Sequence, residues 1–412
     1  MRASHTTTKA LHPVRLLAAG AIVLAAGAAG CNTAESPKTA AVSFASVAIG
    51  GWHGCGLTFA GAADCWGSNG SGEVGNGDST DVSAPAAVTG AHVFTMVSAG
   101  FSHSCGLVGG AAYCWGANAD GQLGTGAITG PQNCNSLVPG SDCSTSPVAV
   151  TGGFTFRVVS AGGEHTCAVT TTGLAYCWGL NTYGQLGGGS ASGPQTCGTA
   201  GDCSGSPVAV AGGFSFVGVS AGAYHTCGLT TAGVAYCWGR NREGELGSGD
   251  TVDSRTPVPV SGGLTFAALS AGGYHTCGLT PAGKAYCWGR GNLGELGTGD
   301  TLSSLTPTAV SGGLAFASVS AGGYHTCGLT PVGQVYCWGY NAYGELGKGD
   351  TTTATAPVQA AGGLTFAAIG AGYYHTCALS TSSTAYCWGD NANGQLGNGS
   401  GLSSASPVVV GQ

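Results

Sequence analysis

The sequence predicts an all-β fold, a seven-bladed β-propeller with about four strands in each blade. One observation is a repeat of about 50 to 60 residues, marked by a histidine in the same local motif. A second is that each repeat holds four short apolar runs, the number of strands in a propeller blade. A third is the abundance of glycine, 79 of 412 residues, which suits tight turns and excludes long helices. The marker histidines are His53, His103, His165, His225, His275, His325 and His375.

The fifth repeat shows the four apolar runs most clearly. They cover residues 257–260, 266–270, 275–280 and 284–288, with glycine-rich turns between them. The first of these, a Pro-Val run, is assigned to the repeat that follows it. The first repeat then lacks such a run, whereas the chain ends in one at 407–410. We therefore expect the strand at 407–410 to close the ring beside the first repeat, which would remove open sheet edges.

Composition is typical of a folded protein with few charges. Apolar residues make up 43% of the chain and charged residues 7%, with a net charge of −7. The apolar share argues against disorder, and the length allows a large buried core. No basic patch is visible, which argues against nucleic acid as a partner.

The N-terminal segment has the pattern of an export signal. Arg2, Lys9 and Arg15 precede or begin an apolar stretch at 16–30, which is too short to span a bilayer comfortably. The stretch ends in Ala-Ala-Gly-Cys and resembles the bacterial lipoprotein signal, with Ala28 in place of the usual leucine. The alternative is an ordinary signal peptide, cut among these small residues.

This pattern predicts three parts of the chain. Residues 1–30 are expected to be a lipoprotein signal peptide, residues 31–41 a tether that begins at a lipidated Cys31, and residues 42–412 the propeller. The expected location is the bacterial outer membrane or cell surface. Contact with the membrane is expected only through the lipid anchor.

The remaining 18 cysteines form an even set, as is typical of an oxidised, exported protein. In each repeat two of them flank a predicted hairpin. Cys277 and Cys287 are centred on Ala282, the middle of the turn, so they face each other across the two strands. Two more pairs lie in longer connections at 130–146 and 193–206, where pairing between the two loops is the alternative. The expected disulfides are Cys55–Cys65, Cys105–Cys114, Cys134–Cys143, Cys167–Cys177, Cys197–Cys203, Cys227–Cys237, Cys277–Cys287, Cys327–Cys337 and Cys377–Cys387.

The repeat motif resembles a known family. It contains Ser-Ala-Gly-Gly-Tyr-His-Thr, followed by Tyr-Cys-Trp-Gly-x-Asn-x-x-Gly-Glu-Leu-Gly. This pattern is similar to the regulator-of-chromosome-condensation repeat, and the resemblance covers residues 42–412. It implies a seven-bladed propeller whose marker histidines are part of the family pattern. Members include an exchange factor for a small GTPase, a plant photoreceptor and a secreted bacterial inhibitor of β-lactamases, so the resemblance predicts fold rather than function. The paired cysteines depart from the family pattern.

Catalytic motifs are missing from the sequence. There is no nucleophile elbow, phosphate loop or His-Glu-x-x-His motif. Asp78, Asp250, Asp300 and Asp350 each follow a glycine, and we expect them to close turns, because one carboxylate per loop is too few for calcium. The glutamate of Gly-Glu-Leu-Gly is glutamine in three repeats, which argues against an acid or base role.

Metal and cofactor sites are not expected. His-x-Cys followed by a second cysteine would supply three zinc ligands per repeat, but no fourth is evident. We therefore expect each marker histidine to be a packed, hydrogen-bonded core residue. The protein is expected not to be an enzyme. The alternatives are a propeller lyase or hydrolase of the cell envelope and a purely structural envelope protein.

Large side chains gather at two turns that vary between repeats, one just before the histidine and one just after Cys-Trp-Gly. In the resembling family these turns lie toward one face. Tyrosine, tryptophan and arginine are enriched at protein-binding hot spots; the alternative is that several of them cap the core. We expect a monomeric binding scaffold whose partner is a protein or, alternatively, a glycan, with the loops at 130–146 and 193–206 adding specificity. The expected binding residues are Trp52, Tyr183, Tyr224, Arg240, Tyr274, Arg290, Tyr324, Tyr340, Tyr343 and Tyr374.

Overall fold

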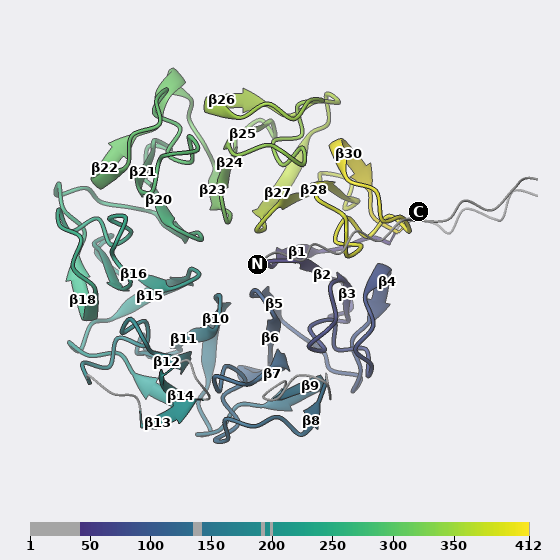
Figure 1. Ribbon diagram of the computed structural model, residues 1–412, viewed down its shortest axis with the longest axis vertical. Coiled ribbons are helices and arrows are strands. Elements are labelled where there is room, and N and C mark those ends of the chain that lie inside the picture. Colours follow the sequence, from purple (N-terminus) through teal and green to yellow (C-terminus); the bar gives the residue numbers. More distant parts are fainter. Residues whose placement is uncertain (1–41, 135–141, 191–193, 198–200, 412) are drawn as a thin grey trace, which may run out of the picture. The chain divides into compact units, whose positions relative to one another are not determined.

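Seven small antiparallel sheets are arranged around a central axis (Figure 1). The computed structural model describes residues 42–134, 142–190, 194–197 and 201–411, which belong to one compact unit. The expected signal peptide at 1–30, the lipidation site Cys31 and the tether lie outside the described residues. Among the described residues, no helix has the length and apolar character needed to cross a membrane. The predicted all-β, seven-bladed propeller is confirmed.

The blades follow one another along the chain. Blade 1 contains β1 (Ser46–Ile49), β2 (His53–Leu57), β3 (Ala63–Gly67) and β4 (Val82–Ala87). Blade 2 contains β5 (Met96–Ala99), β6 (His103–Val108), β7 (Ala111–Ala117), β8 (Gln132–Asn133) and β9 (Asp142–Ala149). Blade 3 contains β10 (Phe156–Ala161), β11 (His165–Thr170), β12 (Ala175–Leu180), β13 (Gln195–Cys197) and β14 (Gly201–Ala209). Blade 4 contains β15 (Phe216–Ala221), β16 (His225–Thr230), β17 (Ala235–Gly239) and β18 (Ser254–Pro259).

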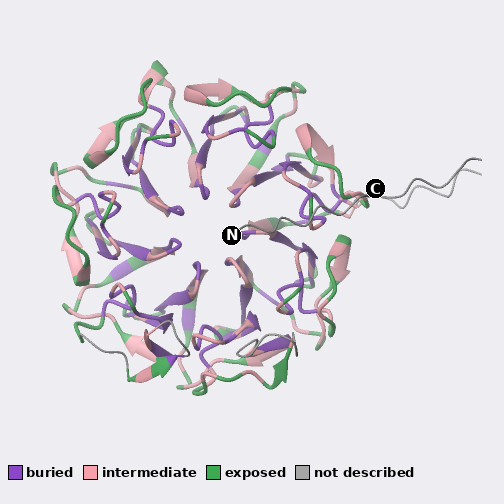
Figure 2. Cartoon of the chain, viewed as in Figure 1, coloured by how far each residue is buried: buried purple, intermediate pink, exposed green. Residues whose placement is uncertain are grey.

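The last three blades repeat the four-stranded pattern. Blade 5 contains β19 (Ala268–Ala271), β20 (His275–Leu279), β21 (Ala285–Gly289) and β22 (Ser304–Ala309). A short 3-10 turn, η1 (Ser311–Gly313), leads to blade 6, which contains β23 (Ser318–Ala321), β24 (His325–Leu329), β25 (Val335–Gly339) and β26 (Ala354–Gln359). Blade 7 contains β27 (Phe366–Ala371), β28 (His375–Ser380), β29 (Ala385–Gly389) and β30 (Ser404–Val409). The first strand of each blade lies nearest the axis, the second and third strands are the most buried, and the outermost strand is largely intermediate or exposed (Figure 2).

The expected manner of ring closure is wrong. The C-terminal strand β30 pairs with β29 inside blade 7, and the first blade has its own outer strand, β4. Each Pro-Val run therefore belongs to the hairpin that precedes it, and every blade is built from one continuous segment. The ring closes without strand exchange: Phe44 donates its backbone N–H to the carbonyl of Ser383 (3.0 Å), and Ser43 bridges Thr384.

The structure pairs the cysteines in the nine disulfides expected from the sequence. In each blade one disulfide joins directly opposed residues of the second and third strands; Cys277 and Cys287, for example, have Cα atoms 4.1 Å apart. These sulfurs are fully buried between neighbouring blades. The other two, Cys134–Cys143 and Cys197–Cys203, each lie within one loop (Cα–Cα 5.9 and 5.8 Å).

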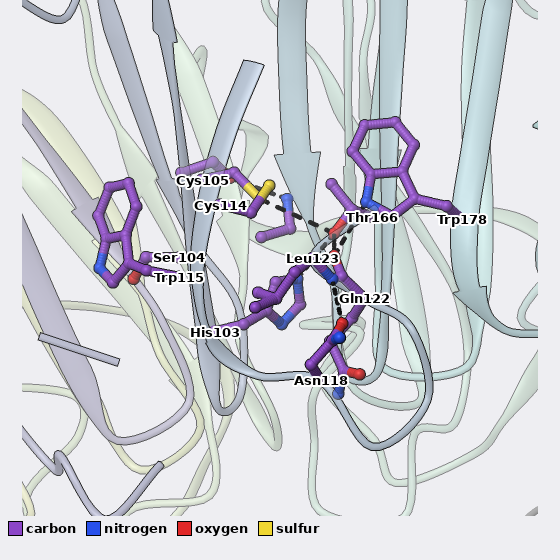
Figure 3. Close-up of a disulfide and its surroundings, with 12 residues drawn as sticks. His103, Ser104, Cys105, Cys114, Trp115, Asn118, Gln122, Leu123, Thr166 and Trp178 are labelled. Carbon is purple, nitrogen blue, oxygen red and sulfur yellow. Dashed lines mark hydrogen bonds between the residues drawn. A yellow bond between two sulfur atoms is a disulfide. The ribbon is translucent and has the colours of Figure 1, made fainter. Parts of the chain in front are cut away.

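A repeated hydrogen-bond relay joins neighbouring blades, shown for blades 2 and 3 in Figure 3. The Thr166 hydroxyl donates its proton to the carbonyl of Gln122 (2.9 Å) and lies 2.8 Å from His103 Nε2. Because that hydroxyl has one proton, it must accept from Nε2–H. Trp178 Nε1 donates to the same Gln122 carbonyl (2.9 Å). Burial lowers the pKa of His103 to about 3, so the imidazole is neutral. The expectation of a hydrogen-bonded core histidine is confirmed for six of the seven marker histidines, whereas among the described residues the ring of the buried His375 has no hydrogen-bond partner.

Candidate functional site

The two variable turns of each blade lie against each other on one face. Arg240 donates its backbone N–H to the carbonyl of Tyr224 (3.0 Å), and Tyr340 donates to Tyr324 (3.0 Å). The equivalent bond is present in all seven blades. It forms because the marker histidine pairs with the glycine of Cys-Trp-Gly in the strand register, so the residues just beyond them meet. The variable side chains are thereby gathered around one end of the axis.

Aromatic side chains form a nearly continuous ring at this end, which we call the aromatic arc. Neighbouring ring centroids are 5.7 Å apart for Tyr183 and Tyr224, and 5.5 Å apart for Tyr274 and Tyr324. Such spacings allow tilted and edge-to-face aromatic contact. The arc extends from blade 3 through blades 4 to 7 and blade 1 to blade 2. Its members are Tyr183, Tyr224, Tyr274, Tyr324, Tyr340, Tyr343, Tyr373, Tyr374, Trp52 and Phe101.

A narrow central channel opens within the arc. It has a volume of about 90 Å³ and is lined mainly by the alanine and glycine residues that precede each marker histidine. The blades approach so closely here that a Cβ on Gly50 would lie 2.3 Å from the carbonyl oxygen of Gly100. Phe101 and Tyr373 are the two aromatic residues in the lining. The channel is too small for a sizeable ligand.

Tyr373 links several blades through its ring and hydroxyl. Its hydroxyl lies 3.0 Å from that of Tyr324 and 3.4 Å from that of Tyr274, which are on blades 6 and 5. Its ring contacts Trp52 of blade 1 at a centroid distance of 5.3 Å. Burial, followed by the hydrogen bonds to the other two tyrosines, raises the pKa of Tyr373 well above its ordinary value. The Tyr373 hydroxyl at the centre of the arc is therefore neutral at physiological pH.

Two arginines lie between successive tyrosines of the arc. The Arg240 guanidinium is 5.2 Å from the ring centroid of Tyr274, and Arg290 is 5.3 Å from the same ring on its other side. Each also forms an ion pair with the buried glutamate of its own blade: Arg240 Nη1 to Glu245 Oε1 at 2.6 Å, and Arg290 Nε to Glu295 Oε1 at 3.3 Å. These arginines are therefore held in place, with cation–π contacts to the rings.

The glutamate of Gly-Glu-Leu-Gly has a structural role in its loop. Glu245 Oε2 accepts the backbone N–H of Glu243 (2.8 Å), and Gln185 Oε1 accepts that of Tyr183 (2.9 Å). One side-chain oxygen suffices for this bond, which explains why glutamine replaces glutamate. Burial raises the pKa of Glu245 to about 7, although Arg240 opposes the shift. The expectation that this position is not a general acid or base remains a prediction.

The glutamate or glutamine of this motif has a second polar atom in its side chain, which in some blades bonds to the side chain of the residue five positions earlier. In blade 1, Ser68 donates to Glu73 (3.2 Å), and in blade 7, Gln395 Nε2 donates to Asp390 (2.9 Å). Blades 3 and 6 differ, because their residues are Leu180 and Tyr340, and Gln185 Nε2 is buried without a hydrogen-bond partner in the described structure. Glu295 Oε1 of blade 5 likewise makes no hydrogen bond but is ion-paired with Arg290. Among the described residues, Glu345 Oε1 is buried without a hydrogen-bond partner. Burial raises the pKa of Glu345 to about 7, and the negative charge of Asp390 adds to this rise.

Each loop disulfide has one cysteine opposite the residue just after Cys-Trp-Gly: Cys143 pairs with Ala117 and Cys203 with Leu180. The strand pairs β8–β9 and β13–β14 form the outer edges of blades 2 and 3 (Figure 1). The connection of blade 2 that leads to β8 contacts the β13–β14 pair, because Gly205 accepts the backbone N–H of Gly126 (2.7 Å) and Gln195 Nε2 lies 3.5 Å from the Gly126 carbonyl oxygen. A role for these loops in specificity therefore requires a partner that covers both the arc and this outer edge.

Metal-binding groups were also sought in the structure. Within the described ranges, no cluster of three His, Cys, Asp or Glu side chains is arranged to hold an ion. The sulfurs that would have completed His-x-Cys zinc sites are joined in disulfides. The aspartates of the Gly-Asp turns bond to their own backbone, as expected: Asp350 Oδ1 accepts the N–H of Thr352 (2.8 Å), and Asp78 that of Thr80 (2.8 Å).

Sequence reasoning identified most of the arc but missed two of its residues, Phe101 and Tyr373, and the buried Glu345. Phe101 and Tyr373 stand where other repeats have glycine or alanine, and a large residue at that position was a visible signal. Glu345 was missed because its difference from Glu245 and Glu295 depends on the residue five positions earlier. Comparing the two positions pairwise across the repeats would have revealed it.

Known proteins share both the repeat and the fold. The chain is 32% identical over 210 residues to the ultraviolet-B receptor UVR8 of Arabidopsis thaliana, which is 50% of this chain and 43% of the receptor. It is 37% identical over 97 residues to the probable E3 ubiquitin-protein ligase HERC4 of Homo sapiens, 23% of this chain and 8% of the ligase. The chain thus matches less than half the length of these curated relatives.

Solved structures at 20% identity show the same fold. Human WBSCR16 aligns with a TM-score of 0.73, covering 85% of this chain and 94% of that one. Yeast RCC1 (Prp20), in a crystal structure of Kap60 bound to it, aligns with a TM-score of 0.69, covering 84% and 83%.

Family models match the repeats themselves. Models of the regulator of chromosome condensation (RCC1) repeat match residues 44–73, 109–169, 156–185, 172–229, 216–245, 232–279, 266–295, 282–329, 316–345, 332–379 and 366–395. These matches cover well over half of the sequence and follow the blades in order. The chain belongs to the regulator of chromosome condensation (RCC1) repeat family.

Proposed function

We propose that this protein is a non-catalytic binding scaffold, exported and held at the bacterial cell surface by a lipid on Cys31, that recognises another protein through the aromatic arc. The single observation that carries the proposal is the arc itself. It gathers partly exposed tyrosine, tryptophan and arginine side chains from several blades on one face. These three residue types dominate the binding energy of protein interfaces.

Two further observations support it. Nine disulfides indicate an oxidising setting, consistent with export. Propellers of this family bind proteins: yeast RCC1 (Prp20) has been crystallised with Kap60 bound to it, and Prp20p of Saccharomyces cerevisiae has binding properties to Gsp1p and histones. Which protein this chain binds is a separate question, because those likenesses concern the fold.

The test begins with affinity capture from the native cell envelope, with the protein as bait, and mass spectrometry of what is retained. Tyr274→Ala and Tyr324→Ala are then compared with the unmodified protein by calorimetry against the captured partner. Loss of a central hot-spot side chain should cost about 2 kcal/mol or more of binding, roughly thirtyfold in Kd. The unfolding free energy should change by about 1 kcal/mol or less, because these side chains are partly exposed.

Val332→Ala serves as the matched control. Val332 is 72% exposed in the turn between β24 and β25, at the opposite end of its blade, so both affinity and melting should be unchanged. A sharp fall in melting temperature with unchanged affinity in the tyrosine variants would mean that the arc only caps the core. A captured glycan in place of a protein would contradict the proposed partner class.

A further inference from the structure

In blades 4 and 5 the aromatic arc contains a cation, the guanidinium of an arginine side chain. In both, an arginine just after Cys-Trp-Gly lies between two tyrosines: Arg290 is 5.3 Å from the Tyr274 ring centroid and 4.9 Å from that of Tyr324. The same guanidinium neutralises the buried carboxylate of Glu295. Tyrosine, guanidinium, tyrosine and buried glutamate together form one local unit, and the chain contains it twice.

Blade 6 has this unit without its cation. Tyr340 takes the arginine position and bridges the rings of Tyr324 and Tyr374, at 6.2 and 6.0 Å. The glutamate is retained as Glu345, and its Oε2 accepts the backbone N–H of Tyr343 (3.0 Å) as in the other blades. Within the described residues, Glu345 Oε1 is fully buried and has no hydrogen-bond partner. A buried carboxylate without a partner is costly, so its retention here calls for an explanation.

Charge around Glu345 also favours a cation from outside. Asp390 lies on the neighbouring blade, and its negative charge adds to that of Glu345. Tyr343, whose backbone N–H bonds to Glu345, is 43% exposed, and its ring centroid lies 5.5 Å from that of Tyr374, so aromatic side chains that solvent reaches stand near the carboxylate. In blades 4 and 5 the equivalent charge is cancelled by Arg240 and Arg290.

Resting on the proposed function, we infer that Glu345, with the rings of Tyr340, Tyr343 and Tyr374, binds an arginine side chain presented by the partner protein. The partner's guanidinium takes the place of the arginine that blade 6 lacks. Arginine suits the site better than lysine, because a planar guanidinium stacks on aromatic rings, pairs with carboxylates through several donors and is weakly hydrated. Tyr340 stands five residues before Glu345, as Arg240 and Arg290 stand before Glu245 and Glu295. It is partly exposed, so its ring has solvent to turn into as the cation enters.

The probe for this site is N-acetyl-arginine amide, compared with the neutral citrulline analogue of the same shape. Binding is followed by NMR titration of the tyrosine ring signals. The arginine compound should shift the signals of Tyr340, Tyr343 and Tyr374, and the citrulline compound should bind at least about tenfold more weakly, because a hydrogen bond to a charged group contributes more than one to a neutral group.

Glu345→Gln should weaken the binding of the arginine probe by about tenfold or more in Kd. It should fold normally, because glutamine stands at this position in blades 2, 3 and 7. Glu295→Gln is the matched control: Arg290 already fills that site, so probe affinity should not change. Equal binding of the probe to the unmodified protein and Glu345→Gln would overturn the inference, as would equal binding of arginine and citrulline.

Tyr340→Arg tests the same idea by filling the site from within. It copies blades 4 and 5, so it should abolish probe binding and raise the melting temperature, because Glu345 gains an ion pair like that of Arg240. Undiminished probe binding by this variant would also overturn the inference. Suppose that Glu345→Gln and Tyr340→Arg leave binding of the captured partner unchanged while Tyr274→Ala weakens it. That result would support the proposed function and contradict the arginine site.

Discussion

The interface between blades 7 and 1, which closes the ring, differs from the interface between blades 5 and 6. At the 5/6 interface the Thr326 hydroxyl lies 2.7 Å from His275 Nε2 and donates to the carbonyl of Glu295 (2.9 Å). At the 7/1 interface Gly54 occupies the threonine position. In the described part of the chain, His375 Nε2 consequently has no hydrogen-bond partner.

A second polar link is also replaced at the closing interface. Ser270 accepts the backbone N–H of Ala321 between blades 5 and 6 (2.9 Å), whereas Gly370 occupies the serine position in blade 7 and packs beside Ile49. The tryptophan bond is kept, since Trp66 Nε1 donates to the blade 7 loop at 3.0 Å. The comparison shows that backbone bonds, the buried tryptophan and apolar packing suffice to close the ring, and that the hydroxyl relay is added elsewhere.

Acidification should have the largest effect on the free energy of unfolding, because it acts on every blade interface at once. Burial lowers the pKa of His53 to about 4 and of His375 to about 3, and the other marker histidines behave similarly. The unfolded chain binds protons at these histidines below pH 6.5 but the native state does not, so stability is lost as the pH falls from about 6.5 toward 3. Each group contributes at most about 1.4 kcal/mol per pH unit.

Buried carboxyls such as Glu345 oppose this trend, because a raised pKa makes the native state bind protons too. We still expect a net loss of several kcal/mol between pH 7 and pH 4.5, measurable by denaturant unfolding with the disulfides intact. A free energy of unfolding that does not change over this range would contradict the neutral, buried state of the histidines.

Thr326→Val should have the next largest effect. It removes the hydroxyl that joins His275 to the Glu295 carbonyl and leaves a buried Nε2–H without a partner. The expected cost is about 2 kcal/mol, read as a lower midpoint of thermal or denaturant unfolding. Thr376→Val, at the 6/7 interface, should cost a similar amount, because Thr376 makes the same two bonds. A cost near zero in both would show that every interface depends mainly on the contacts kept at 7/1.

Gly54→Ser should have the smallest effect on the free energy of unfolding, and it should raise that free energy where the other changes lower it. It supplies the hydroxyl that the closing interface lacks, within reach of His375. A Cβ at Gly54 would lie 3.0 Å from the Trp66 ring, so that ring must shift slightly. Ser104 occupies the equivalent position opposite Trp115, which shows that serine fits there. We expect a gain of about 0.5 to 1 kcal/mol in unfolding free energy; a loss would mean that Trp66 cannot move.

The hairpins were predictable because the interactions that define them are local. The pairing of Cys277 with Cys287 follows from the turn midway between them, and the seven histidines set the number of blades. The assignment of the Pro-Val strands was wrong because each run lies between two hairpins in the sequence. Only the sheet pairing of β30 with β29 shows which hairpin it joins.

The candidate site was predictable in part. The resemblance to the repeat family implied that the two variable turns lie toward one face, and the strand register of the structure brings them together. It did not indicate that Tyr373 bonds to tyrosines of two other blades, or that Glu345 lacks the arginine that Glu245 has.

The sequence by itself thus determined the fold class, the number of blades and which cysteines face each other, since these depend on turns and on residues a few positions apart. The tertiary structure alone decided how the ring closes, which histidine lacks a hydroxyl and which buried carboxylate lacks a cation. Those features depend on atoms of neighbouring blades that are about 50 residues apart in sequence, and more than 300 at the closing interface. Contact between such distant segments is set by how the blades pack, and no local pattern specifies it.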